Sequence, residues 1–210
     1  MTTSSSGLSA TKMNAPWGLF YDQPTGKLFV AEFSNRRVLI YNGIPTTNGA
    51  AADVVVGQSN FTTNTTTFGA SGLSSSTDVA VINGKLYVSD WGGRRVLIWN
   101  SVPTTNGATA DLVIGQQDLT SGFADQGGIP TSRTLDRPHA LLYDGQRLFI
   151  SDRGNSRILI YNSLPTANNH SADIVIGQAN FSSQNGNQTG STTVPGANTL
   201  YFNHNLAIVK

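Results

Sequence analysis

Three acidic residues and three arginines recur along the chain at one spacing, and their opposite charges allow them to form ion pairs. Each acidic residue is followed five positions later by an arginine: Glu32 and Arg37, Asp90 and Arg95, and Asp152 and Arg157. A short turn would bring each carboxylate to its guanidinium, and a bidentate pair would satisfy both groups at a partly buried edge. Because every copy has the pair, we expect a structural role and no catalytic one.

A second set of side chains differs between the copies and is where we look for ligand binding. The turn between acid and arginine reads FSNR, WGGR and RGNS in the three copies. The candidate ligand face consists of Trp17, Phe33, Arg36, Trp91, Arg94, Arg137, His139 and Arg153. Aromatic and arginine side chains are favoured in binding hot spots. The simpler interpretation is that Phe33 and Trp91 only cover neighbouring loops, and the sequence leaves both open.

These residues belong to one stretch that the chain repeats three times without a gap, at residues 27–61, 85–119 and 147–181. Self-similarity at a long period indicates a modular array. Within the first copy, four short runs rich in β-branched and aromatic residues predict strands, separated by turns that contain Gly, Pro or Asn. These predicted strands are Trp17–Asp22, Lys27–Glu32, Arg37–Asn42 and Asp53–Gln58.

Four antiparallel strands in each repeat predict an all-β protein, and repeated four-stranded sheets are the blades of a β-propeller. A parallel β-solenoid is the alternative, but its coils are much shorter than these repeats. We expect one array over residues 1–210, with blades at about 14–61, 74–119 and 136–181. Residues 195–210 resemble the first two strands of a fourth, partial blade.

The strand sequences resemble the NHL repeat, whose pattern is a P-x-G strand, a Y-V-A-D strand and an N-x-R-V strand. The first repeat has Pro16 and Gly18, then LFVAE at residues 28–32, then NRRV at residues 35–38. The second repeat departs from the pattern, with Ser76 for the proline and Gly93 for the asparagine. The ADxVxGQ tail of each repeat is similar to long-repeat bacterial members. The resemblance implies a propeller, whereas members of this family differ widely in function.

Composition narrows the function classes. Charged residues make up 12% of the chain and the net charge is +1, so a polyanion or a lipid surface is not the expected partner. The chain has no cysteine, which excludes disulfides and thiolate metal sites.

The N-terminus lacks the pattern of a signal peptide, and no segment is apolar enough to span a membrane. We nevertheless expect an extracellular or cell-surface parent, because Thr-, Asn- and Gly-rich loops with few charges resemble those of secreted repeat proteins.

We expect a non-catalytic module that binds a protein or a saccharide, with no catalytic residue, no cofactor and no metal. The first alternative is a metal-dependent lyase or hydrolase, as in related propellers, with a channel site near His139 and with Asp78 or Asp136 beside it. The second alternative is single-stranded RNA, bound by arginines and stacked on Phe33 and Trp91. The small net charge makes nucleic acid the weaker expectation.

The chain has too few repeats to close a propeller by itself. Propellers close with four to eight blades, whereas this chain has three full repeats and part of a fourth. Either the sequence belongs to a longer chain, or two copies join as a homodimer to complete a ring. We favour the longer chain.

Overall fold

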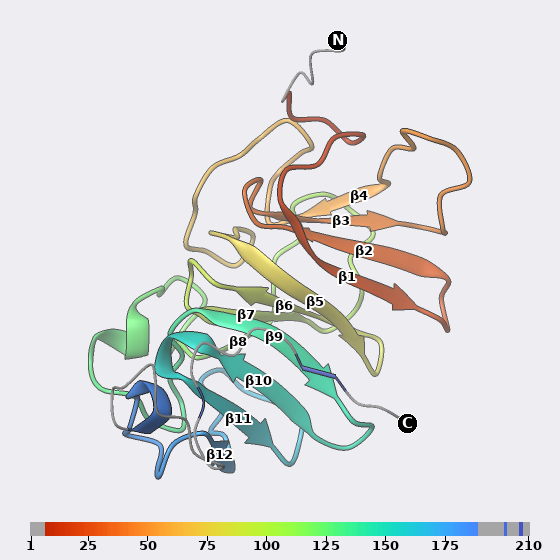
Figure 1. Ribbon diagram of the computed structural model, residues 1–210. Helices are drawn as coiled ribbons and strands as arrows, with labels where there is room; N and C mark the ends of the chain where they lie inside the picture. Colours follow the sequence, from red (N-terminus) through yellow and green to blue (C-terminus); the bar gives the residue numbers. More distant parts are fainter. Residues whose placement is uncertain (1–6, 189–199, 201–205, 208–210) are drawn as a thin grey trace.

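The computed structural model describes residues 7–188, 200 and 206–207. Its strands form three antiparallel sheets of four, and each sheet follows the order of the chain (Figure 1). Blade 1 contains β1 (Pro16–Asp22), β2 (Lys27–Glu32), β3 (Arg37–Tyr41) and β4 (Val54–Val56). Blade 2 contains β5 (Ser76–Ile82), β6 (Lys85–Asp90), β7 (Arg95–Trp99) and β8 (Leu112–Ile114). Blade 3 contains β9 (Pro138–Tyr143), β10 (Leu148–Asp152), β11 (Arg157–Tyr161) and β12 (Ile174–Ile176).

The fourth strand of each blade is shorter than predicted. The sequence pattern predicted a strand through Gln58, whereas β4 ends at Val56. Gly57 follows with a φ of +86°, and Gly115 and Gly177 end β8 and β12 with φ values of +87° and +90°. A strand cannot continue through this left-handed conformation, which glycine adopts at little cost.

Two apolar clusters join the blades. One packs Phe29, Ile40 and Val56 of blade 1 against residues of blade 2 that include Leu97 and Trp99. The other packs the far side of blade 2, including Tyr87, against blade 3. The first strand β1 lies beside β5, and β5 lies beside β9 (Figure 1). In each sheet the fourth strand forms the edge opposite the first strand. This arrangement is that of β-propeller blades and confirms the predicted all-β fold class.

A glycine allows the first two blades to approach each other closely. A Cβ atom on Gly18 of β1 would lie 2.7 Å from the Cα atom of Asp78 and 2.8 Å from the carbonyl oxygen of Thr77, both in β5. These distances are too short for any side chain. The P-x-G motif of the first repeat therefore serves the packing of β1 on β5.

Two expectations concern parts of the chain that the structure covers only in part. The partial fourth blade predicted at residues 195–210 lies outside the described residues, apart from Leu200, Leu206 and Ala207, which are in no strand. The single array over 1–210 therefore stays a prediction. In the described residues, no helix has the length and apolarity needed to cross a membrane.

Candidate functional site

The acid–arginine pairs lie inside the blades. The Nε atoms of Arg37, Arg95 and Arg157 lie 2.5, 3.0 and 2.7 Å from carboxylate oxygens of Glu32, Asp90 and Asp152, and all six side chains are fully buried. Each pair joins the last residue of the second strand to the first residue of the third, because these residues are opposite each other in the antiparallel register. The partly buried edge that the sequence suggested is thus a fully buried position.

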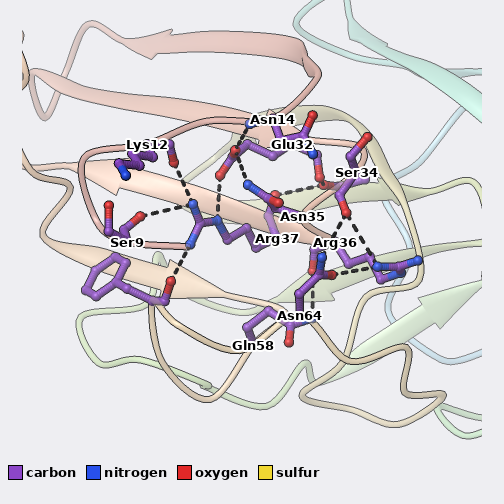
Figure 2. Close-up of polar contacts among 12 residues, drawn as sticks. Ser9, Lys12, Asn14, Glu32, Ser34, Asn35, Arg36, Arg37, Gln58 and Asn64 are labelled. Atoms are coloured by element: carbon purple, nitrogen blue, oxygen red, sulfur yellow. Dashed lines mark hydrogen bonds and ion pairs between the residues drawn. The ribbon is translucent and has the colours of Figure 1, made fainter. Parts of the chain in front are cut away.

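The remaining donors of each arginine bind loops. In blade 1, Nη1 of Arg37 donates to the carbonyl of Phe61 at 2.8 Å, and Nη2 donates to the carbonyls of Ser9 and Lys12 at 3.1 and 2.8 Å. Figure 2 shows this guanidinium between Glu32 and the carbonyls. Arg95 binds the carbonyls of Leu119, Gly69 and Gly72 in the same way. The predicted bidentate pair is therefore wrong for these two arginines, because the carbonyls take both terminal nitrogens.

Five of the predicted face residues come together in one cluster. The rings of Trp17 and Phe33 stack with centroids 4.2 Å apart and an interplanar angle of 19°. The ring of Trp17 also lies 5.6 Å from the ring of His139, centroid to centroid. Phe33 also meets Trp91 edge-on at 5.6 Å, and the guanidinium carbon of Arg137 lies 5.4 Å from the centre of the Trp91 ring. The cluster therefore crosses all three blades.

Irregular backbone positions these side chains. Trp17 lies at a bulge of β1, because the pairing with β2 shifts between Pro16 and Gly18. A bulge turns a side chain away from the regular alternation of a strand. Phe33 and Trp91 occupy equivalent turns after β2 and β6, and Arg137 has a φ of +54° immediately before β9. As a result, Trp17 is 52% exposed, although it contacts two other rings.

An acidic residue connects the cluster to a further arginine. Asp136 lies 3.8 Å from Nη1 of Arg137 and 3.5 Å from Nε of Arg94. Arg94 also donates to the carbonyl of Gly92 at 2.8 Å. The sequence suggested Asp136 only as a metal ligand near His139, whereas in the structure its carboxylate partly neutralises two arginines of the face.

The two other predicted arginines lie in the equivalent turns. Arg36 donates to the carbonyl of Ser34 at 3.4 Å and to the side chain of Asn64 at 2.6 Å, so it binds its own turn and the following loop (Figure 2). Arg153 is half-buried in the 3₁₀ turn η2 (Arg153–Asn155) after β10. Their part in ligand binding stays a prediction.

Beyond Arg94 lies a pocket that the sequence analysis missed. It has a volume of about 390 Å³ and is lined by Phe68, Arg94, Thr120, Gly122, Phe123 and Ala124. Phe68 and Phe123 are 47% and 70% exposed. Each belongs to a polar, glycine-rich loop between two blades, so a single aromatic in each loop was the signal that could have revealed it.

Asp78 is the most unusual ionisable residue near the cluster. Its carboxylate accepts hydrogen bonds from the backbone N–H of Leu141 at 2.8 Å and of Val79 at 2.9 Å, so it joins blade 2 to blade 3. Burial raises its pKa to about 6, against the two hydrogen bonds, which lower it. Among the described residues, no three His, Asp or Glu side chains lie close enough together to hold a metal ion.

Comparison with known proteins gives structural likeness alone. No family model and no curated protein sequence matches the chain. Solved structures that match include a glutaminyl cyclase from Myxococcus xanthus (14% identity, TM-score 0.41) and a virginiamycin B lyase from Staphylococcus aureus (10%, 0.40). A nidogen/laminin complex also matches (15%, 0.40). The matches cover 69%, 76% and 72% of this chain and 47%, 45% and 44% of those chains, so it spans less than half their length.

Proposed function

We propose that the chain is a non-catalytic binding module of the NHL-repeat type whose ligand is a protein. The observation that carries the proposal is the cluster of Trp17, Phe33, Trp91, Arg137 and His139, which side chains of three blades form together. Exposed aromatic rings with a neighbouring arginine are typical of interaction hot spots. The low charge and the polar loops further suggest a module that works at the cell surface or outside the cell.

The extent of the surface favours a protein over a small saccharide. From Trp91 the side chains run through Arg137, Asp136 and Arg94 to the pocket beside Phe68 and Phe123. Aromatic anchors at both ends, with ion pairs between them, suit a peptide segment that carries apolar and charged side chains. A single sugar ring would need only the Trp17 end.

The test selects a ligand first and then locates it. Peptides from a random displayed library are enriched on the immobilised chain, and their affinity is measured by calorimetry for wild type, Trp17→Ala and Trp91→Ala. We expect each substitution to weaken binding about 30-fold, the loss of roughly 2 kcal/mol that a hot-spot aromatic produces. Tyr21→Ala is the matched control, because Tyr21 is 46% exposed on the same strand as Trp17 and lies outside the cluster.

Three results would contradict the proposal. If the enriched peptides bind both tryptophan variants as tightly as wild type, the ligand face is elsewhere. If no peptide is enriched and a glycan array gives binding that depends on Trp17, the module binds saccharides. If a single-stranded RNA binds with an affinity that falls steeply between 50 and 200 mM salt, on the order of a thousandfold, phosphate contacts dominate and the RNA alternative holds.

A further inference from the structure

The pocket beside Arg94 depends on one difference between two equivalent loops. In the loop after β4, the side-chain oxygen of Asn64 accepts a hydrogen bond from Nη1 of Arg36 at 2.6 Å. Arg94 occupies the position of Arg36 in the next repeat, and Gly122 occupies the position of Asn64. Because Gly122 has no side chain, Arg94 lacks the partner that Arg36 has.

Gly122 also makes room for one wall of the pocket. A Cβ atom at this position would overlap two carbon atoms of the Phe68 ring, which comes from the preceding loop between blades. Phe123 is the second aromatic wall. The side-chain nitrogen of Gln116 donates to the carbonyls of Phe123 and Arg94 at 2.8 and 2.9 Å, and Gln116 is fully buried. The backbone on both sides of the pocket is therefore held in place by one side chain.

Arg94 lines the pocket and has unused hydrogen-bond donors. Its Nη1 donates to the carbonyl of Gly92 at 2.8 Å. Its Nε lies 3.5 Å from a carboxylate oxygen of Asp136 and makes no hydrogen bond in the described part of the chain. A guanidinium has five N–H donors in a planar fork and can bind a carboxylate through two of them. Arg94 can therefore accept an anionic partner.

The ion pairs beside the pocket leave its arginine weakly compensated. Asp136 lies 3.5 Å from Arg94 and 3.8 Å from Arg137, so one carboxylate is shared by two guanidinium groups. Within the described residues, the carboxylates of Asp118 and Asp125 form no ion pair with either arginine and accept hydrogen bonds from hydroxyl or amide groups instead. An incoming carboxylate would give Arg94 a closer partner than Asp136.

We propose that this pocket binds the C-terminus of a peptide whose last side chain is apolar. The α-carboxylate pairs with Arg94, and the last side chain lies between Phe68 and Phe123. The volume of about 390 Å³ is near the lower end for ligand pockets and suits one such residue. Neighbouring side chains of an extended peptide point in opposite directions, whereas a terminal residue carries both groups itself. An internal acidic residue therefore fits this pocket less well.

This inference rests on the proposed peptide-binding function and adds the direction of the peptide. With its C-terminus at Arg94, the preceding residues run past Asp136 and Arg137 toward Trp91. The terminal residue alone determines binding in the pocket, so short peptides that do not reach Trp91 are sufficient to test it.

Three acetylated tripeptides provide the test, each titrated into the protein while its backbone amide signals are followed by NMR. Gly-Gly-Leu with a free C-terminus is expected to bind with a dissociation constant on the order of millimolar and to shift the signals of residues 120–124. The same peptide as a C-terminal amide lacks the carboxylate, and Gly-Asp-Leu amide carries it on an internal side chain. Each amide is expected to bind at least about tenfold more weakly.

Variants of the chain show whether Arg94 is responsible. Arg94→Gln is expected to weaken binding of the free acid at least about tenfold. Arg36→Gln is the matched control, because Arg36 has the equivalent position but already donates to Asn64, and it should bind as wild type. Phe123→Ala removes a wall that is 70% exposed, so it tests the pocket without disturbing the core, and it should weaken binding about tenfold.

Several results would overturn the inference. These are no binding of the free acid at millimolar concentrations, equal binding of either amide, and binding that Arg94→Gln leaves unchanged. Failure of the proposed function looks different. Displayed peptides that need Trp17 and Trp91 but tolerate C-terminal amidation support the binding module and overturn only the inference. Free acid that binds wild type and Trp91→Ala equally supports the pocket, even if the displayed peptides bind without either tryptophan.

Discussion

At the scale of single residues, one arginine in each blade has several functions. Arg95 binds Asp90 and also three backbone carbonyls from two loops, and no part of its side chain is exposed. A buried charge is tolerated only when it is paired and its remaining donors are satisfied. Lysine could not replace this arginine, because its single nitrogen cannot reach four acceptors in a planar arrangement.

Asp78 gives a prediction about pH. Burial raises the pKa of this carboxyl to about 6 in the folded chain, from an ordinary value of 3.8. The folded state therefore holds the proton more tightly, and the stability that this group contributes is complete below about pH 4 and is lost as the pH rises through 6. We expect the unfolding free energy of wild type, minus that of Asp78→Asn, to be about 2 kcal/mol larger near pH 4.5 than near pH 7.5.

Urea unfolding at the two pH values measures this difference. Subtracting the variant removes the titration of the other carboxyl groups, since these are common to both proteins. A difference between the two proteins that does not change with pH would contradict the raised pKa of Asp78.

At the scale of elements, the first strand of each blade determines how closely neighbouring blades approach. β1 packs on β5 and β5 on β9, and at Gly18 the backbone of β1 comes too close to β5 for a side chain. The bulge that begins at Pro16 also directs Trp17 toward the cluster. A single strand end thus serves both packing and the candidate site.

Gly18→Ala tests this close approach. Its Cβ atom would lie within 2.8 Å of the backbone at Asp78 and Thr77, so β1 must move, and we expect a loss of about 2 to 3 kcal/mol in unfolding free energy. Gly43→Ala is the control, because a Cβ atom there has nothing within 4 Å, and it should leave stability unchanged within about 0.5 kcal/mol. Equal denaturation midpoints for the two variants would show that β1 and β5 are not in close contact.

At the scale of the whole molecule, the three blades have equivalent positions in different surroundings. Leu39, Leu97 and Leu159 are all fully buried at the same place in their blades. Leu97 belongs to the cluster between blades 1 and 2, and Leu159 to the cluster between blades 2 and 3. Leu39 belongs to a smaller cluster within blade 1, which also contains Val30, Tyr41 and Val55.

These surroundings predict different costs for one substitution. Leu97→Ala and Leu159→Ala should each lower the unfolding free energy by about 3 to 5 kcal/mol, because two packed blades cannot close the cavity. Leu39→Ala should cost nearer 2 kcal/mol, since loops and the segment before β1 can move inward. Denaturant unfolding of the three variants gives the values. A loss at Leu39 as large as at Leu97 would mean that the outer side of blade 1 is packed as rigidly as a junction between blades.

The sequence by itself determined the strands, the blades and the residues that vary between them. Alternating apolar residues and turn residues act over a few neighbouring positions, so three gapless copies were enough to predict four-stranded sheets and the carboxylate partners of Arg37, Arg95 and Arg157, although not that these pairs are fully buried. The fourth strand was predicted but drawn too long, because the local pattern does not show that Gly57 has a positive φ and that Leu73 packs against it.

Only the tertiary structure decided which of the varying residues meet. The carbonyls that bind Arg37 lie 24 to 28 residues away, and Trp17 meets His139 although blade 2 separates them in the sequence. The same holds for Asp136 with Arg94, and for Asn106 with Val55 of the preceding blade. Such contacts depend on how closely and at what angle blades pack, which follows from the sum of many side-chain contacts and not from any local pattern in the chain.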